Sequence, residues 1–258
     1  MSLTIEQTTT MIDTNDAKWQ VDSHHAPDKS SSWSHPIKDD GWVLAHNALR
    51  RELQDILEAV SKLKAHYPKT PQWAIESLAR VWKEHAAHVK GHHVNEDEIA
   101  TPAMKKRIHL PDKLESDHEI VLQKVQTVTH GIHSLQEHGP VTSVEQALLD
   151  YKDVLFPHLL EEEEIALPLF RSYFSPKDWA PVMRKIAMKA KNELGSFIYY
   201  QTKENFREKF MKQEGIPFFV WHLLFRKKYQ YFLDNVKAHL DALETGVPML
   251  PKKKTLFC

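Results

Sequence analysis

Along most of the chain, apolar residues recur every three or four positions, the period of a helix that buries one face. Between Asp39 and Pro168 there are four such stripes, separated by short breaks rich in proline, glycine and histidine. We therefore expect four long helices. They are 39–65, a second that carries Ile75 to Ile99 and ends between Pro102 and Pro111, 112–137, and a fourth that begins at the capping residues Thr142 and Ser143 and stops near Pro168.

The C-terminal third continues the helical pattern. Ser175 to Asp178 is a good helix start, and basic amphipathic segments follow over 177–212 and 217–243. Short breaks between the first four helices favour antiparallel neighbours. The expected fold is all-α, an up-down-up-down four-helix bundle with an N-terminal arm and a helical C-terminal extension.

The same pattern divides the chain into four parts. An irregular arm, 1–38, is rich in Ser, Thr, Asp and His and could be pinned by Trp19 and Trp33. The bundle is expected over 39–172, the helical extension over 173–247 and a loose tail over 248–258.

The amino-acid composition disfavours or excludes several classes of binding site and function. The 258 residues include 7 Gly, which disfavours phosphate loops, and 17 His, which need an explanation because imidazole is the commonest metal ligand. The single cysteine, Cys258, excludes an intrachain disulfide and a thiolate metal cluster. A net charge of −1 disfavours nucleic-acid binding. No apolar run approaches the length of a membrane span and no secretory signal is evident, so we expect a cytoplasmic protein.

An internal repeat carries the candidate chemistry. Residues 92–102 align without gaps on 158–168, with the shared pattern His-x-x-x-Glu-x-Glu-Ile-Ala-x-Pro. The spacing of four residues places His and Glu on one helical face, within reach of a common metal ion. Both pairs lie on the apolar stripe, where an unpaired carboxylate would be costly.

Each repeat follows a helix with a lone histidine near its start. His46 and His118 lie early in the first and third helices, whereas the repeats lie late in the second and fourth, so an antiparallel bundle brings them to the same end. The expected metal ligands are His46, His92, Glu96, His118, His158 and Glu162. Four imidazoles and two shared carboxylates suit two metal ions. Mixed nitrogen and oxygen ligands favour iron, with manganese or zinc as alternatives.

Four motifs resemble those of the hemerythrin-like, HHE cation-binding domains. They are the segment Trp42–Arg50 around His46, His92-x-x-Asn95-Glu96, His118 within Glu115–Glu119, and His158-x-x-x-Glu162. The resemblance covers roughly 39–170 and implies a four-helix bundle with an oxo- or hydroxo-bridged non-haem di-iron centre. Carried over, it implies that His46 and His92 serve one iron, that His118 and His158 serve the other, and that Glu96 and Glu162 bridge them.

The chain departs from the oxygen-carrying hemerythrins at two places. Those proteins have two histidines four residues apart on the third helix, whereas Leu114 and Leu122 flank His118 here. They also have His-x-x-x-x-Asp on the fourth helix, where this chain has His158-x-x-x-Glu162. With one imidazole missing, sensing, iron handling or oxidative chemistry is favoured over reversible oxygen carriage.

Other polar residues near the motifs are expected to lie outside the set of metal ligands. His85 and His88 share the face of His92, and Tyr151 occupies the repeat position of His85, so His88 and Tyr151 are the candidate catalytic residues. His93 lies about 100° from His92 on the helix and is expected to be exposed. Glu163 and Glu164 are expected to face solvent, with Glu161 a potential partner of the ligands.

Three functions remain open, and the sequence does not decide whether the protein is an enzyme. The first is a di-iron protein that binds or activates O2, peroxide or nitric oxide for sensing, redox chemistry or iron handling, with a protein partner at the C-terminal helices. The second is a di-iron oxidase, oxygenase or iron-centre repair enzyme. The third is a metal-free helical module whose polar layer fixes the register of the bundle.

A ferritin-like bundle is disfavoured because only Glu115-x-x-His118 matches its Glu-x-x-His motif. The stripe Phe218–Phe225 is expected to pack on the bundle.

Overall fold

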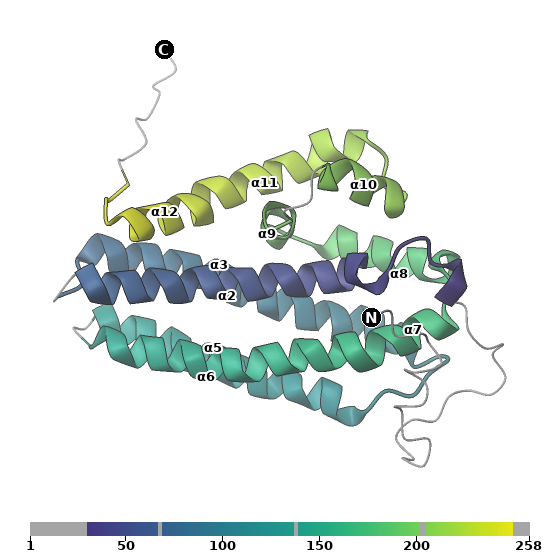
Figure 1. Cartoon of the computed structure of the whole chain (residues 1–258), viewed down its shortest axis with the longest axis horizontal. Helices are drawn as coiled ribbons and strands as arrows, with labels where there is room; N and C mark the ends of the chain where they lie inside the picture. The colour runs from purple at the N-terminus through teal and green to yellow at the C-terminus, as the bar shows by residue number, and fades with distance from the viewer. Residues whose placement is uncertain (1–29, 67–68, 137–138, 202–204, 250–258) are drawn as a thin grey trace.

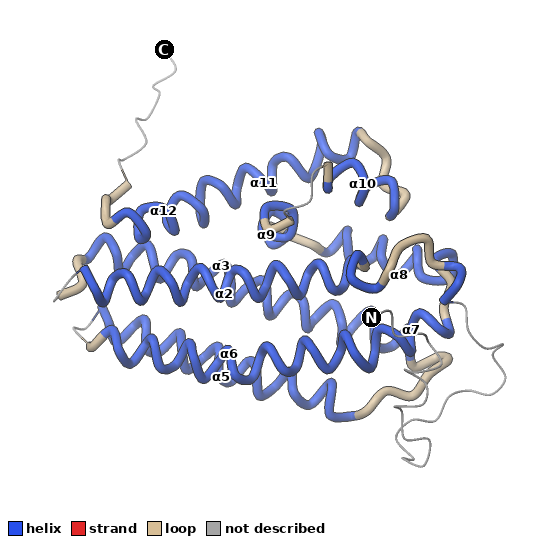
Figure 2. The backbone as a smooth tube through the Cα atoms, viewed as in Figure 1, coloured by secondary structure: helices blue, strands red, loops and turns tan. Residues whose placement is uncertain are grey.

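A computed structural model describes residues 30–66, 69–136, 139–201 and 205–249. Every regular element in these ranges is helical, as predicted from the period of the apolar stripes (Figure 2). The four helices of the bundle are α2 (Gly41–His66), α3 (Gln72–Asn95), α5 (Asp112–Gln136) and α6 (Val141–Glu161). Each packs against two of the others, α2 on α3 and α6, and α5 on α3 and α6 (Figure 1).

The beginning of α6 differs from the prediction. The helix starts at Val141 directly after Pro140, and no side chain caps it. Thr142 and Ser143 lie inside its first turn, because the proline already sets the extended backbone that precedes a helix. The cap assigned to these two residues was therefore wrong.

The second helix ends at Met104, between Pro102 and Pro111 as predicted, whereas the fourth continues past Pro168 to Tyr173. In each, a π-helical turn begins at the glutamate of the repeat, Glu96–Ala100 and Glu162–Ala166, and a short α-helix follows, α4 (Thr101–Met104) and α7 (Leu167–Tyr173). Proline lacks an N–H group and its ring crowds the carbonyl four residues earlier. The wider turn accommodates this, and such turns are frequent at functional sites. The Ile-Ala-x-Pro sequence that both repeats share thus accounts for the two π-helical turns.

The C-terminal extension begins as predicted and then breaks more often than predicted. Helix α8 (Pro176–Lys189) starts with a complete capping box between Ser175 and Asp178. The expected segment 177–212 is divided into α8, α9 (Glu193–Tyr199) and α10 (Phe206–Gln213), because extended backbone at Ala190 turns the chain across the bundle. The last helix is continuous through η5 (Trp221–Phe225), α11 (Arg226–Phe232), η6 (Leu233–Lys237) and α12 (Ala238–Thr245).

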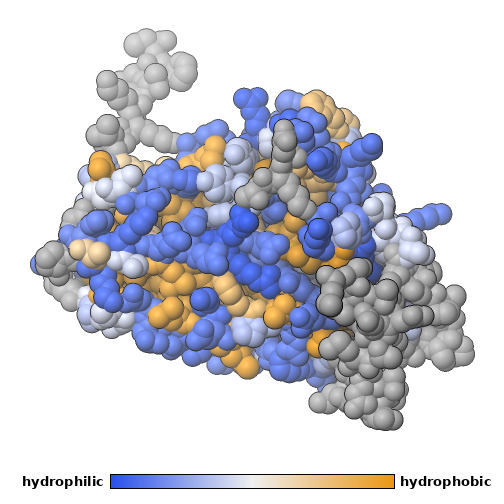
Figure 3. Space-filling view, viewed as in Figure 1, coloured by the Kyte–Doolittle hydropathy of each residue, from blue (hydrophilic) through white to orange (hydrophobic). Residues whose placement is uncertain are grey.

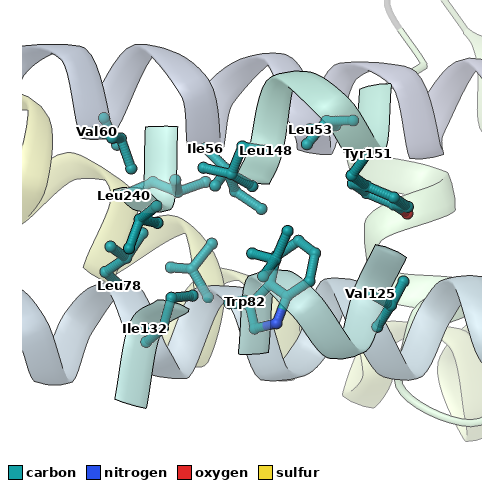
Figure 4. Close-up of a cluster of buried hydrophobic side chains, with 14 of the residues drawn as sticks. Leu53, Ile56, Val60, Leu78, Trp82, Val125, Ile132, Leu148, Tyr151 and Leu240 are labelled. Atoms are coloured by element: carbon teal, nitrogen blue, oxygen red, sulfur yellow. The ribbon is translucent and has the colours of Figure 1, made fainter. Parts of the chain in front are cut away.

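Helix α9 lies between the bundle and α11, nearly end-on in Figure 1. At Gly195 the two helices approach so closely that a Cβ atom would lie 2.2 Å from the Lys228 carbonyl oxygen, so only glycine fits there. Helix α12 packs on α2 and α3, and Leu240 reaches the bundle core beside Leu78 (Figure 4). The extension therefore completes the main core.

The stripe Phe218–Phe225 packs only in part. Trp221 and Phe225 are buried in a small separate cluster with Met211, but Phe218, Phe219 and Leu224 are exposed. The space-filling view shows apolar side chains at the surface near the junction of α10 and α11 (Figure 3). The expectation that the whole stripe covers the bundle was wrong.

Part of the arm is described. The Trp33 indole N–H donates to the Phe174 carbonyl oxygen at 2.8 Å, which attaches the arm to the end of α7. Trp19 lies outside the described residues. Within the described ranges, no helix has both the length and the apolar character needed to cross a membrane.

Candidate metal centre

The structure brings the six predicted ligands together at one level of the bundle. His46 comes from α2, His118 from α5, and the two His/Glu pairs from the ends of α3 and α6. Ligand atoms of His46, His92, Glu96 and Glu162 all lie within 4.8 Å of one another. A second group with the same spacing contains His118 and His158, together with His93.

Both carboxylates lie between the two groups. Glu162 Oε2 is 3.3 Å from His46 Nε2, whereas its Oε1 is 3.6 Å from His118 Nε2 and 3.7 Å from His158 Nε2. Glu96 Oε1 is 3.0 Å from His92 Nε2, and its Oε2 is 3.6 Å from His118 Nε2. Each glutamate thus presents one oxygen to each group, which is the arrangement of a bridging carboxylate.

His93 is a residue that sequence analysis misplaced. It is only 1% exposed, and its ring stacks on His118 at 4.1 Å and meets His158 edge-on at 5.3 Å. The 100° step from His92 does not lead to solvent, because α3 packs on both α2 and α5. His92 turns to the α2 side and lies 4.9 Å from His46, while His93 turns to α5 and α6. The adjacent pair of histidines at the start of the first repeat was the available signal.

Two further acidic residues hold the lone histidines. The Nδ1–H group of His46 donates to Glu163 Oε1 at 2.8 Å, and Arg50 also donates to that oxygen at 2.6 Å. The Nδ1–H group of His118 donates to Asp97 Oδ1 at 2.8 Å. A carboxylate only accepts, so these bonds leave Nε2 of both histidines as the free ligand atom.

The expected roles of the acidic run on α6 need correction. Glu163 is half-buried against His46 and does not simply face solvent, whereas Glu164 is exposed as predicted. Glu161 pairs with Lys113 at the surface and does not contact the ligands. Asp97 and Glu163 occupy the same repeat position, directly after Glu96 and Glu162, and this shared acidic residue was the signal that the sequence offered.

The carboxylates of the cluster favour positive charge on the two histidines nearest to them, His46 and His118. Burial by itself lowers the pKa of His46, but the nearby carboxylates of Glu162 and Glu163 outweigh it and raise the pKa well above its usual value. For His118, burial opposes the same kind of shift, and Glu162 and Glu96 raise the pKa to about 9. Burial lowers the pKa of His93 and His158, which keeps these imidazoles neutral. Metals bind neutral imidazole and carboxylate, so a cation that binds here displaces the Nε2 protons of His46 and His118.

The residues present fit a metal pair, because their polar atoms lack other partners. Among the described residues, 10 of the 14 buried side-chain nitrogen and oxygen atoms without a hydrogen bond belong to this cluster. They come from His46, His92, His93, Glu96, His118, His158 and Glu162. Unsatisfied buried polar groups are rare in folded proteins and need an explanation, and cations placed here would give one nitrogen of each imidazole and the carboxylate oxygens a partner.

The two candidate catalytic residues lie outside the ligand groups. Tyr151 and His88 belong to a second buried polar cluster, which also contains Glu52 and His85. The structure therefore places neither residue among the atoms that surround the candidate metal positions.

A helical bundle with a layer of inward-facing histidine and glutamate at one end is the architecture of a cation-binding protein. Comparison with protein families supports this class. The model of the hemerythrin HHE cation-binding domain matches residues 38–170, and the chain belongs to this family. Comparisons with curated proteins and with solved structures gave no match.

Proposed function

We propose that the protein holds two iron ions in this site and binds or activates O2, or a related small oxidant, for sensing or for redox and iron handling. The observation that carries the proposal is the placement of Glu96 and Glu162, each with one oxygen toward each group of histidines. Nitrogen and carboxylate ligands together favour iron among the common metals, with manganese or zinc as alternatives.

In this proposal the two ions differ in their ligands. His46 and His92 would hold one ion, His93, His118 and His158 the other, and both carboxylates would bridge. The ion held by His46 and His92 would have one imidazole ligand fewer than the other. When bound, the iron pair supplies electrons to such an oxidant. Glu163 and Asp97 would fix the orientation of His46 and His118.

The size of the cavity beside the site is an argument for a small ligand. A cavity of about 10 Å³ touches both bridging glutamates and His118, with Trp42 and Leu114 in its wall. This is room for about one water molecule, and by size it suits a diatomic molecule or peroxide better than an organic substrate.

The direct experiment is metal analysis of the purified protein together with its aerobic absorption spectrum. We expect close to two iron ions per chain and charge-transfer bands at the edge of the ultraviolet, as oxo-bridged ferric pairs give. Protein that is folded and binds neither iron nor manganese near stoichiometric amounts would overturn the proposal and leave a helical interaction module.

The carboxylate behind His46 can be tested separately. Glu163→Ala should weaken metal binding by about 10–100-fold, the usual effect of removing a carboxylate that orients a metal-bound histidine. The readout is a metal titration of the purified variant. Glu164→Ala is the matched control, because this neighbour is exposed, and its metal affinity should not change. Equal losses in the two variants would contradict the role of Glu163.

A further inference from the structure

A second buried polar cluster lies in the bundle core, apart from the candidate metal centre. Glu52 from α2 contacts His85 and His88 from α3, and Ser196 of α9 donates its hydroxyl to the same carboxylate. Tyr151 from α6 completes the cluster and is fully buried, 0% exposed (Figure 4). Apolar residues of similar volume would stabilise a core at least as well as buried charges, so packing alone does not account for it.

The hydrogen bonds of the cluster have a defined direction. His85 Nδ1 lies 2.7 Å from Glu52 Oε2, and because a carboxylate only accepts, the proton is on Nδ1. In the neutral ring the other nitrogen, Nε2, then carries a lone pair, and it lies 3.1 Å from the Tyr151 hydroxyl. The phenol therefore donates to a neutral imidazole that is itself held by a carboxylate.

The charge states of Glu52 and Tyr151 agree with a hydrogen bond donated by Tyr151 to His85. Burial by itself would raise the pKa of Glu52, but the charge of His88 and the hydrogen bonds from His85 and His88 lower it to about 2, so the carboxylate stays ionised. Burial and the charge of Glu52 raise the pKa of Tyr151 well above its usual value. The phenol does not ionise by itself at neutral pH, and its proton can leave only together with an electron.

The cluster lies two helical turns from the candidate metal centre. Tyr151 precedes His158 by seven residues, and His85 precedes His92 by seven, which is about 10.5 Å along each helix. Trp82 packs edge-on to Tyr151 at 5.6 Å. Electrons can cross such a distance through a packed protein core without a continuous chain of hydrogen bonds.

We propose that Tyr151 is a redox-active residue that gives one electron to the metal pair and, in the same step, its phenolic proton to His85 Nε2. The O–H bond of Tyr151 breaks, an N–H bond forms on His85, and a neutral tyrosyl radical remains. The imidazolium that forms is stabilised by Glu52. This inference rests on the proposed function, since the metal pair and dioxygen supply the oxidant.

The electrons balance with dioxygen as the oxidant. Reduction of O2 to two water molecules takes four electrons and four protons. A ferrous pair gives two electrons on becoming ferric, Tyr151 gives the third, and a ferrous ion from solution gives the fourth. The phenolic proton stays on His85, and the four protons of water come from solvent.

Tyr151 differs in its hydrogen-bond partner from Tyr200 and Tyr231. The Tyr200 hydroxyl donates to Asp55 and that of Tyr231 to Glu84, both carboxylates. Imidazole is a stronger base than a carboxylate by about two pH units, so His85 is the better acceptor of a proton released on oxidation. Tyr200 therefore provides a matched control.

The test is to mix anaerobic, ferrous-loaded protein with oxygenated buffer, freeze the sample within milliseconds and record its electron paramagnetic resonance spectrum. We expect an organic radical signal that narrows when the protein carries ring-deuterated tyrosine. Tyr151→Phe should abolish it and Tyr200→Phe should leave it unchanged. His85→Gln should lower the radical yield at least about tenfold, because no strong base then accepts the proton.

Metal content and the optical bands of each sample separate the possible failures. A signal that persists in Tyr151→Phe would overturn the assignment. Wild-type protein that binds two iron ions and shows their bands, but forms no radical, would overturn this inference and leave the proposed function intact. Protein that binds no iron would overturn both.

Discussion

Replacing His93 with alanine should leave the protein with one tightly bound metal ion in place of two. His93 is one of three imidazoles in its group, and it stacks on His118 at 4.1 Å, so its loss removes a ligand and opens a space beside another. Metal analysis after gel filtration measures the stoichiometry. We expect the affinity of the remaining ion to change little, because the His46 group retains its ligands.

The control for this experiment is His130→Ala. His130 is exposed on α5 and belongs to neither ligand group, so the variant should keep two ions. If His93→Ala also retained two ions with wild-type affinity, the buried position of His93 would reflect packing alone, and the second ion would depend on His118 and His158.

Replacing Glu162 with alanine should have a larger effect, the loss of both ions. Its two oxygens face the two groups of histidines, at 3.3 Å from His46 Nε2 and 3.6 Å from His118 Nε2. A ligand present at 1,000 times its dissociation constant stabilises the folded state by about 4 kcal/mol. For a chain of this size we therefore expect the Tm of the variant to fall about 10 °C below that of the metal-loaded protein.

Chelator treatment of the wild-type protein should produce a similar shift in Tm. Glu161→Ala is the matched control, because this neighbour pairs with Lys113 at the surface and its loss should cost little. Unchanged iron content and Tm in Glu162→Ala would rule out the bridging role.

The helices and the level at which the ligands meet could be read from the sequence because both depend on regular spacing. The apolar stripes placed α2 and α5 to within two residues at each end. The positions of His46 and His118 early in their helices, and of the repeats late in theirs, placed the ligands at one end of the bundle. Local periodicity and short connections are therefore sufficient to predict the helices and the end of the bundle at which the ligands meet.

His93 could not be placed in this way because a period assigns each helix a single buried face. The candidate metal centre is wider than one side chain, and α3 contacts both α2 and α5 there, so two adjacent residues face inward. Glu163 and Asp97 were missed for a related reason, since their partners His46 and His118 lie on other helices. The break at Ala190 depends on packing between distant segments, which no local pattern records.

The contacts of α9 bear on where the autonomous folding unit ends. Ser196 of this helix bonds to Glu52 inside the bundle, and Tyr200, Phe232 and Leu240 of the extension belong to the main core. A fragment limited to the matched segment 38–170 would place the Glu52 cluster and part of the core in water. The family's domain is therefore shorter here than the cooperative unit, and truncation after α7 should yield an aggregation-prone fragment.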